Sequence, residues 1–217
     1  MLLTISFATL AIVLEVSQVI TFPAPLAAAI KDNNPERAAT LYLRSLALEP
    51  AAPSAWHNYG TVLNSLSQYQ DALFALRLSL RLDPIVADVW CNLGLAYFGL
   101  ENFVSAERAF RHAIALDASH AASHTNLGNA LISVLQPEEA LLHLERGVEL
   151  DRSSTHSLWN LGLAYLLLGD YTKGWEYYEV RFENEDFKHV TIPTSGPRLR
   201  DLARRPQQRR GPDLPQN

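Results

Sequence analysis

The chain has 217 residues, of which 48% are hydrophobic and 19% are charged, a composition typical of globular proteins that excludes collagen-like and strongly charged disordered chains. Its formal net charge of -5 is uneven, because the residues after Ser195 carry six Arg and two Asp, whereas the rest of the chain carries 12 basic and 21 acidic residues. An acidic body excludes a nucleic-acid surface, which needs clustered Lys and Arg. The single cysteine, Cys91, excludes an internal disulfide and favours a reducing compartment, so we expect a cytoplasmic protein.

Residues 1–18 form an apolar N-terminal segment with no charged residue before Glu15. The apolar run at residues 1–14 is shorter than the roughly 20 residues that span a bilayer. It lacks the positive flank of a signal peptide, although the three alanines at residues 27–29 are compatible with a cleavage site. A packing helix, a signal peptide and a membrane anchor all remain open for this segment.

From Pro53 onward the sequence repeats with a period of 34 residues. Four blocks follow one another without a gap: 53–86, 87–120, 121–154 and 155–188. The eighth position of each block is glycine: Gly60, Gly94, Gly128 and Gly162. A partial copy at residues 19–52 precedes them, with Ala38, Tyr42, Ser45 and Pro50 in matching positions. A fixed period of this length predicts a repeat array rather than a single globular core.

Each block predicts two antiparallel helices joined by a short polar break. In the first block, apolar residues recur three and four apart from Trp56 to Leu63 and again after Tyr69, which is helical periodicity. A glycine inside a helix costs about 1 kcal/mol relative to alanine. The glycine column therefore predicts that the two helices approach closely, and a column of small residues in the second helix is expected to face it: Ala72, Ala106 and Ala140. Pro84 is expected to end the second helix.

The segments AWHNYGTVL, VWCNLGLAY and LWNLGLAY, together with the later alanine and the LDP ending, resemble the tetratricopeptide repeat. The resemblance covers residues 53–188 well and residues 19–52 in part. It implies an all-α fold over residues 19–188, a right-handed α-solenoid of antiparallel helix pairs whose inner groove is lined mainly by first helices. It also implies that the partner is a protein or a peptide.

A column of asparagines stands two residues before the glycines: Asn58, Asn92, Asn126 and Asn160. An amide offers one acceptor and two donors, so a row of amides in the groove can pair with both the C=O and the N–H groups of an extended peptide. The arrangement resembles the asparagine ladder of the O-linked N-acetylglucosamine transferases. The alternative is structural, because asparagine is common at this position of the repeat and can bond a neighbouring turn.

Asn129 and Trp159 lie beside this column and complete the predicted peptide-binding residues. The Lys and Arg that chaperone-tail receptors use to clamp a terminal carboxylate are missing from the groove positions. We therefore expect a moderately apolar extended ligand or a partner helix.

The sequence predicts no catalytic, cofactor-binding or metal-binding residue. His120 and His124 are four apart, but no third ligand follows at a spacing typical of zinc sites. Cys91 has no nearby Lys or Arg to lower its pKa, which favours an inert thiol. The recurring Asp83, Asp117 and Asp151 fall at equivalent helix ends, where bonding to the local turn explains them. No phosphate-binding glycine loop occurs, so we do not expect an enzyme.

The last block departs from the repeat pattern. Arg181 occupies a column that is otherwise small, and Asp186 stands in the column where Pro84 ends the first block. An inward stripe is still predicted for the second helix: Tyr171, Trp175, Tyr178 and Phe182. Residues 189–217 predict an extended, disordered basic tail.

The stretch GDYTKGWEYYEVRF, followed by PTSGPRLRDL, resembles the junction in bacterial proteins whose tetratricopeptide repeats lead into a glycosyltransferase domain. No catalytic region of that kind can be assigned here. Two functions from different classes follow. The favoured one is a protein-binding scaffold that holds an extended peptide or a partner helix in its groove. The alternative is the substrate-recruiting portion of a truncated glycosyltransferase that lacks its catalytic domain.

Overall fold

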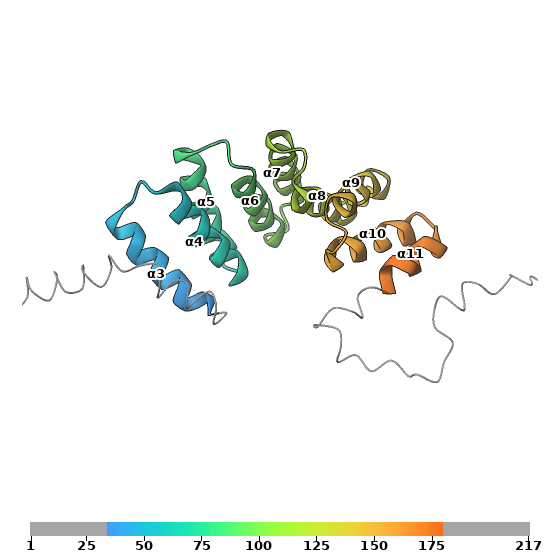
Figure 1. Ribbon diagram of the computed structural model, residues 1–217, viewed down its shortest axis with the longest axis horizontal. Helices are drawn as coiled ribbons and strands as arrows, with labels where there is room; N and C mark the ends of the chain where they lie inside the picture. The colour runs from blue at the N-terminus through green and yellow to red at the C-terminus, as the bar shows by residue number, and fades with distance from the viewer. Residues whose placement is uncertain (1–33, 180–217) are drawn as a thin grey trace, which may run out of the picture. The chain divides into compact units, whose positions relative to one another are not determined.

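The structure is a computed structural model that describes residues 34–179, and every regular element in this range is an α-helix (Figure 1). The helices are α3 (Pro35–Leu48), α4 (Pro53–Ser65), α5 (Tyr69–Leu82), α6 (Ala87–Gly99), α7 (Phe103–Leu116), α8 (Ala121–Ser133), α9 (Pro137–Leu150), α10 (Thr155–Leu167) and α11 (Tyr171–Tyr178). They belong to two compact units, one reaching Asn126 and one beginning at Leu127, so that α8 contains the division.

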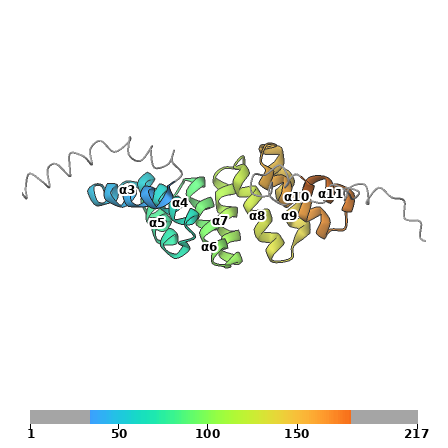
Figure 2. The same ribbon diagram turned by 90° about the horizontal axis from the view of Figure 1, so that it is seen from below.

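Each 34-residue block holds one helix pair, as its periodicity predicts. The first helices of the four blocks are α4, α6, α8 and α10, and the second helices are α5, α7, α9 and α11. Helix α3 is the second helix expected of the partial copy. In the unit that ends at Asn126, α4 packs against α5 and α6 against α7, while α5 also contacts α6 (Figures 1 and 2). In the other unit, α10 contacts both α9 and α11. This packing of consecutive pairs is that of a tetratricopeptide-type solenoid and confirms the predicted all-α fold class.

The glycine column permits close contact between the helices of a pair. A Cβ added at Gly94 would lie 2.4 Å from Cε1 of Phe110, and one at Gly60 would lie 2.6 Å from Cγ of Leu76. The predicted close approach is therefore correct. The prediction that small residues face the glycines holds in part. A Cβ at Gly128 would lie 3.2 Å from the main-chain oxygen of Ala140, whereas at Gly60 and Gly94 the nearest atoms belong to large side chains four residues beyond the small column. The alanine column, represented by Ala72, is nevertheless fully buried.

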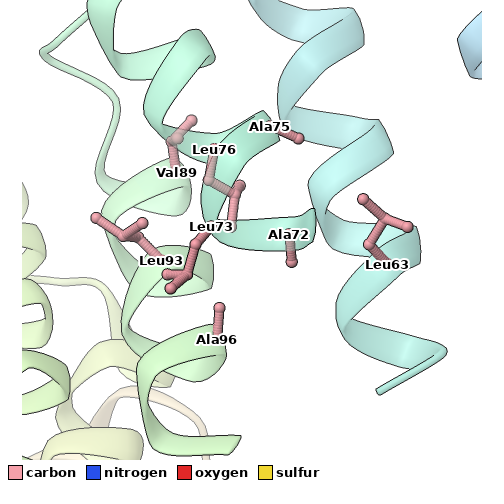
Figure 3. Packing of buried hydrophobic residues seen from close by; sticks show 8 residues of the cluster. All are labelled: Leu63, Ala72, Leu73, Ala75, Leu76, Val89, Leu93 and Ala96. Atoms are coloured by element: carbon pink, nitrogen blue, oxygen red, sulfur yellow. The ribbon is translucent and has the colours of Figure 1, made fainter. Parts of the chain in front are cut away.

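One hydrophobic core cluster of the first unit lies between α4, α5 and α6. Figure 3 shows the eight residues of this cluster: Leu63, Ala72, Leu73, Ala75, Leu76, Val89, Leu93 and Ala96. Trp56 and Trp90 pack against its edge, and each indole Nε1–H donates to a main-chain carbonyl six residues earlier, at Pro50 and Pro84. Because this cluster combines side chains of α4 and α5 with side chains of α6, its burial stacks one repeat on the next.

One position of the turn inside each pair has left-handed backbone. It is the fifteenth position of each block: Ser67 (φ 58°), Glu101 (φ 57°), Leu135 (φ 60°) and Gly169 (φ 82°). The residue after it donates its N–H to a carbonyl five residues earlier, as Gln136 does to Leu131. This is the Schellman ending of an α-helix, which favours glycine. Only the last repeat has glycine there, so the other three repeats hold a side chain in a strained conformation.

Helix α11 is shorter than the other helices. Gly174 is buried in it and Trp175 and Tyr178 are half-buried, but Tyr171 is 61% exposed, so its place in the predicted inward stripe is wrong. Phe182, Arg181 and Asp186 lie outside the described residues, as do the N-terminal segment 1–18 and the tail 189–217. No helix within residues 34–179 has the length and apolar character needed to cross a membrane.

Candidate functional site

The predicted binding residues lie on the first helices, and these helices share an unusual charge property. Helices α4, α6, α8 and α10 contain no Lys or Arg, and Asp88 is their one acidic residue. All basic residues described before Asn126 lie on second helices: Arg37, Arg44, Arg77, Arg81, Arg108 and Arg111. A surface made by first helices is therefore almost free of charge.

In the unit that ends at Asn126, six residues at helical spacing define this surface, which we call the first-helix face: His57, Asn58 and Thr61 on α4, and Asp88, Asn92 and Leu95 on α6. Asn58, Thr61 and Asp88 are exposed, and the other three are half-buried. Hydrogen bonds from Asn92 to residues of α4 show that the two halves of the face adjoin.

The side chain of Asn92 bridges two repeats. Its Nδ2 lies 2.8 Å from Nε2 of His57 and 3.1 Å from Oγ1 of Thr61. The Thr61 hydroxyl donates to the carbonyl of His57, so its oxygen accepts from Asn92. The second hydrogen of Nδ2 then points to Nε2 of His57, which must accept and therefore carries no proton. Burial also lowers the pKa of His57, against the opposing effect of Asp88.

These bonds limit what Asn92 can offer a ligand. Both hydrogens of its amide are used between the repeats, and only the oxygen Oδ1 has no partner among the described residues. Asn92 can accept a hydrogen bond from a peptide N–H, but it cannot also donate to a peptide carbonyl without breaking the bridge. Asn58 is different, because it is exposed and its amide makes no hydrogen bond within residues 34–179.

The other predicted residues are placed less uniformly. The Nδ2 of Asn126 donates to Sγ of Cys91 at 3.5 Å, which repeats the link seen 34 residues earlier between Asn92 and His57. Asn160 is only 2% exposed, and its Nδ2 lies 3.1 Å from Nε2 of His156. Asn160 therefore presents almost no surface to a ligand, and its binding role stays a prediction.

Asn129 and Trp159, which belong to the unit that begins at Leu127, are half-buried. The Trp159 ring lies 6.4 Å from the rings of both His156 and Tyr178. The structure thus joins Trp159 to the aromatic cluster of the last repeat. Its contact with a ligand, like that of Asn129, stays a prediction.

The two histidines considered as zinc ligands have separate structural roles. The main-chain N–H of Ser123 donates to Nδ1 of His120 at 3.1 Å, so the His120 ring satisfies an N–H at the start of α8. The opposite nitrogen, Nε2, then donates to Oδ1 of Asp88 at 2.9 Å. The Nε2 of His124 lies within hydrogen-bond distance, 3.2 Å, of the carbonyl oxygen of Ala118. Trp56 and Trp90, at the same position of their repeats, also hydrogen-bond to a carbonyl six residues earlier.

Asp88, His120 and Ser123 form a series of acid, imidazole and hydroxyl, with Ser123 Oγ 2.8 Å from Nδ1 of His120. Ser123 has no exposed surface, so no substrate can reach its oxygen. The series is a helix cap rather than a nucleophilic site. Within residues 34–179 no group of three His, Cys, Asp or Glu side chains is arranged to hold a metal ion.

The remaining polar candidates have structural explanations. Cys91 is buried, and this burial raises the pKa of its thiol, which fits the prediction of an inert cysteine. Asp83, Asp117 and Asp151 follow the last residues of α5, α7 and α9, and each accepts the N–H two residues later. The prediction that they bond their local turns is confirmed.

Comparison with known families identifies the repeat. Family models of the tetratricopeptide repeat match residues 41–74, 87–120 and 125–180. These residues form tetratricopeptide repeats. None of the curated proteins matches the chain.

Solved structures with the same repeats are similar to this chain. The crystal structure of MamA is 22% identical over 74% of this chain and 94% of its own, with a TM-score of 0.61. A thermophilic tetratricopeptide protein in Thermus thermophilus is 18% identical over 76% of this chain and 92% of its own, with a TM-score of 0.66. YrrB, described as a tetratricopeptide protein with an unusual peptide-binding site, is 22% identical over 83% of this chain and 93% of its own, with a TM-score of 0.57. At these identities the similarity shows the fold.

Sequence reasoning misses two parts of the tetratricopeptide surface. His57 and Thr61 are not among the predicted binding residues, although the spacing of 35 residues from His57 to Asn92 and from Cys91 to Asn126 is a signal of the link between repeats. Asp88 is not among them either. The sequence feature that could have identified Asp88 is that it is the one charged residue in the four first helices.

Proposed function

We propose that this chain is a non-enzymatic scaffold that binds an extended peptide or a partner helix on the first-helix face. The observation that carries the proposal is the near absence of charge from the first helices, combined with exposed amide and hydroxyl groups. The second helices, in contrast, carry the Arg residues expected of a solvated surface. A face of this kind suits a ligand recognised through its backbone and its apolar side chains.

The hydrogen bonds between the repeats support this proposal by holding the face in one arrangement. The Asn92 bridge fixes the positions of His57 and Thr61, so a ligand meets groups whose rotamers are already ordered. Binding to an ordered surface avoids part of the entropy cost of immobilising side chains. Asn58 supplies free donors and an acceptor, and Asn92 adds an acceptor.

Two further observations support a peptide or protein ligand. YrrB shares the fold, and its description includes a peptide-binding site. The first-helix face also lacks the basic residues that would select a terminal carboxylate, so we propose an internal segment of the partner as the ligand. The glycosyltransferase alternative depends largely on residues beyond Glu179, which lie outside the described range, and it stays a prediction.

The experiment is a selection from a phage-displayed library of random peptides on the full chain, followed by affinity measurements with the enriched peptide in synthetic form. Asn58→Arg places a long charged side chain on the face and is expected to weaken binding at least tenfold. Gln70→Arg makes the matched change at an exposed amide of α5 and should leave affinity unchanged. Equal affinity of the two variants, or failure to enrich any peptide, would refute the proposal.

A further inference from the structure

Asp88 stands out on the first-helix face because it places a negative charge where no other charged residue occurs. Its side chain is 67% exposed, in the first turn of α6. One carboxylate oxygen, Oδ1, accepts from His120, and the other oxygen has no partner among residues 34–179. The carboxylate is therefore open to a second donor from solvent or from a ligand.

The fold itself does not require an acid at this position. A carboxylate in the first turn of a helix interacts favourably with the helix dipole. The equivalent residues of the other first helices are nevertheless Ser54, Ala122 and His156, none of which is acidic. The cap made by His120 needs only one acceptor oxygen, so the negative charge exceeds what this structural role uses.

In the unit that ends at Asn126, no described Lys or Arg lies on the first helices that form the surface around Asp88. Those described before Asn126 lie on second helices, and the ionisable groups that interact with Asp88 are His57, His120 and the buried thiol of Cys91. His57 is held neutral by its bond from Asn92, and His120 already donates to Asp88. The exposed oxygen is therefore left for a cation that a ligand supplies.

We propose that the ligand of the first-helix face carries one Lys or Arg side chain that pairs with Asp88, within a segment that is otherwise uncharged. The inference rests on the proposed function and adds a specificity determinant to it. The charge complementarity is restricted to one position, because the rest of the face offers amides, a hydroxyl and the apolar side chain of Leu95. A ligand with several basic residues gains nothing further there, and an acidic ligand is repelled by Asp88.

The test repeats the phage selection on Asp88→Asn and on Asp71→Asn. Asp71 is an exposed acid in the first turn of α5 and is the matched control. Peptides selected on the unmodified chain and on Asp71→Asn should share one Lys or Arg position. Selection on Asp88→Asn should lose that preference while still enriching peptides. Melting temperatures of both variants are measured alongside, since Asp88→Asn also alters the cap at His120.

A double-mutant cycle between Asp88 and the basic residue of the peptide separates their interaction from any change in the stability of the fold. The selected peptide and its version with the basic residue replaced by Gln are titrated against the unmodified chain and Asp88→Asn. The basic residue should strengthen binding about two- to fivefold on the unmodified chain only, and salt should reduce this gain. Enriched peptides without a basic position, or a gain that survives in Asp88→Asn, would overturn the inference and leave the proposed function standing. If no peptide is enriched, both fail.

Discussion

The Asn92 bridge predicts that two members of the asparagine column differ in stability when changed to alanine. Asn92→Ala removes the hydrogen bonds to His57 and Thr61, and Asn58→Ala removes no hydrogen bond formed within residues 34–179. Each hydrogen bond contributes a net 0.5–1.5 kcal/mol or so, and water replaces part of it at the exposed Thr61. Both substitutions gain about the same helix propensity, roughly 0.5 kcal/mol.

The difference between the two variants therefore isolates the bridge. We expect Asn92→Ala to be about 1 to 2 kcal/mol less stable than Asn58→Ala. Urea unfolding followed by circular dichroism measures both free energies, and the urea slope checks that the transition is the same. If the two variants agree within roughly 0.5 kcal/mol, the bridge adds nothing to stability and the asparagine column acts only on ligands.

Three further predictions follow from the turn, the glycine column and the histidine. Leu135→Gly should stabilise the protein by about 1 kcal/mol, because Leu135 is 81% exposed and has left-handed backbone. The control Leu142→Gly, at a 66% exposed site inside α9, should destabilise the protein by about the same amount. Thermal unfolding of both variants measures the two changes in stability. Gly94→Ala should destabilise the protein by roughly 1 to 2 kcal/mol despite its better helix propensity, because the new Cβ meets Phe110, and a gain in the urea midpoint would contradict this. Burial lowers the pKa of His57 in the folded chain, so the unfolded chain binds more protons and stability should fall as the pH drops from neutral through 6.5; a His57→Gln variant with the same pH dependence would refute this.

The repeat period and the glycine column predict most of the fold because both depend on spacing along the chain. The turn geometry was not predictable in the same way. Glycine marks the left-handed position only at Gly169, and Ser67, Glu101 and Leu135 are forced into that conformation by the packing of the helices on either side. At Tyr171 the sequence pattern was misleading. Its spacing fits the inward stripe, but its position at the start of a short helix leaves its side chain exposed.

The candidate site was predictable in its residue types but not in its hydrogen bonds. The sequence identified the asparagine column, yet the partner of each amide depends on which residue of the preceding repeat faces it. His57 and Cys91 receive Nδ2 from the next repeat, whereas Asn160 turns to His156 of its own helix. These choices follow from tertiary packing, which the periodicity does not contain.

The central claim is that the first-helix face, whose one charged residue is Asp88, binds the ligand. Backbone amide chemical shifts of the isotope-labelled chain, recorded while the selected peptide is added, test this claim most directly. We expect the largest shifts at Asn58, Thr61 and Asn92 on α4 and α6. Shifts concentrated on the second helices α5 and α7, with these three residues unchanged, would contradict it.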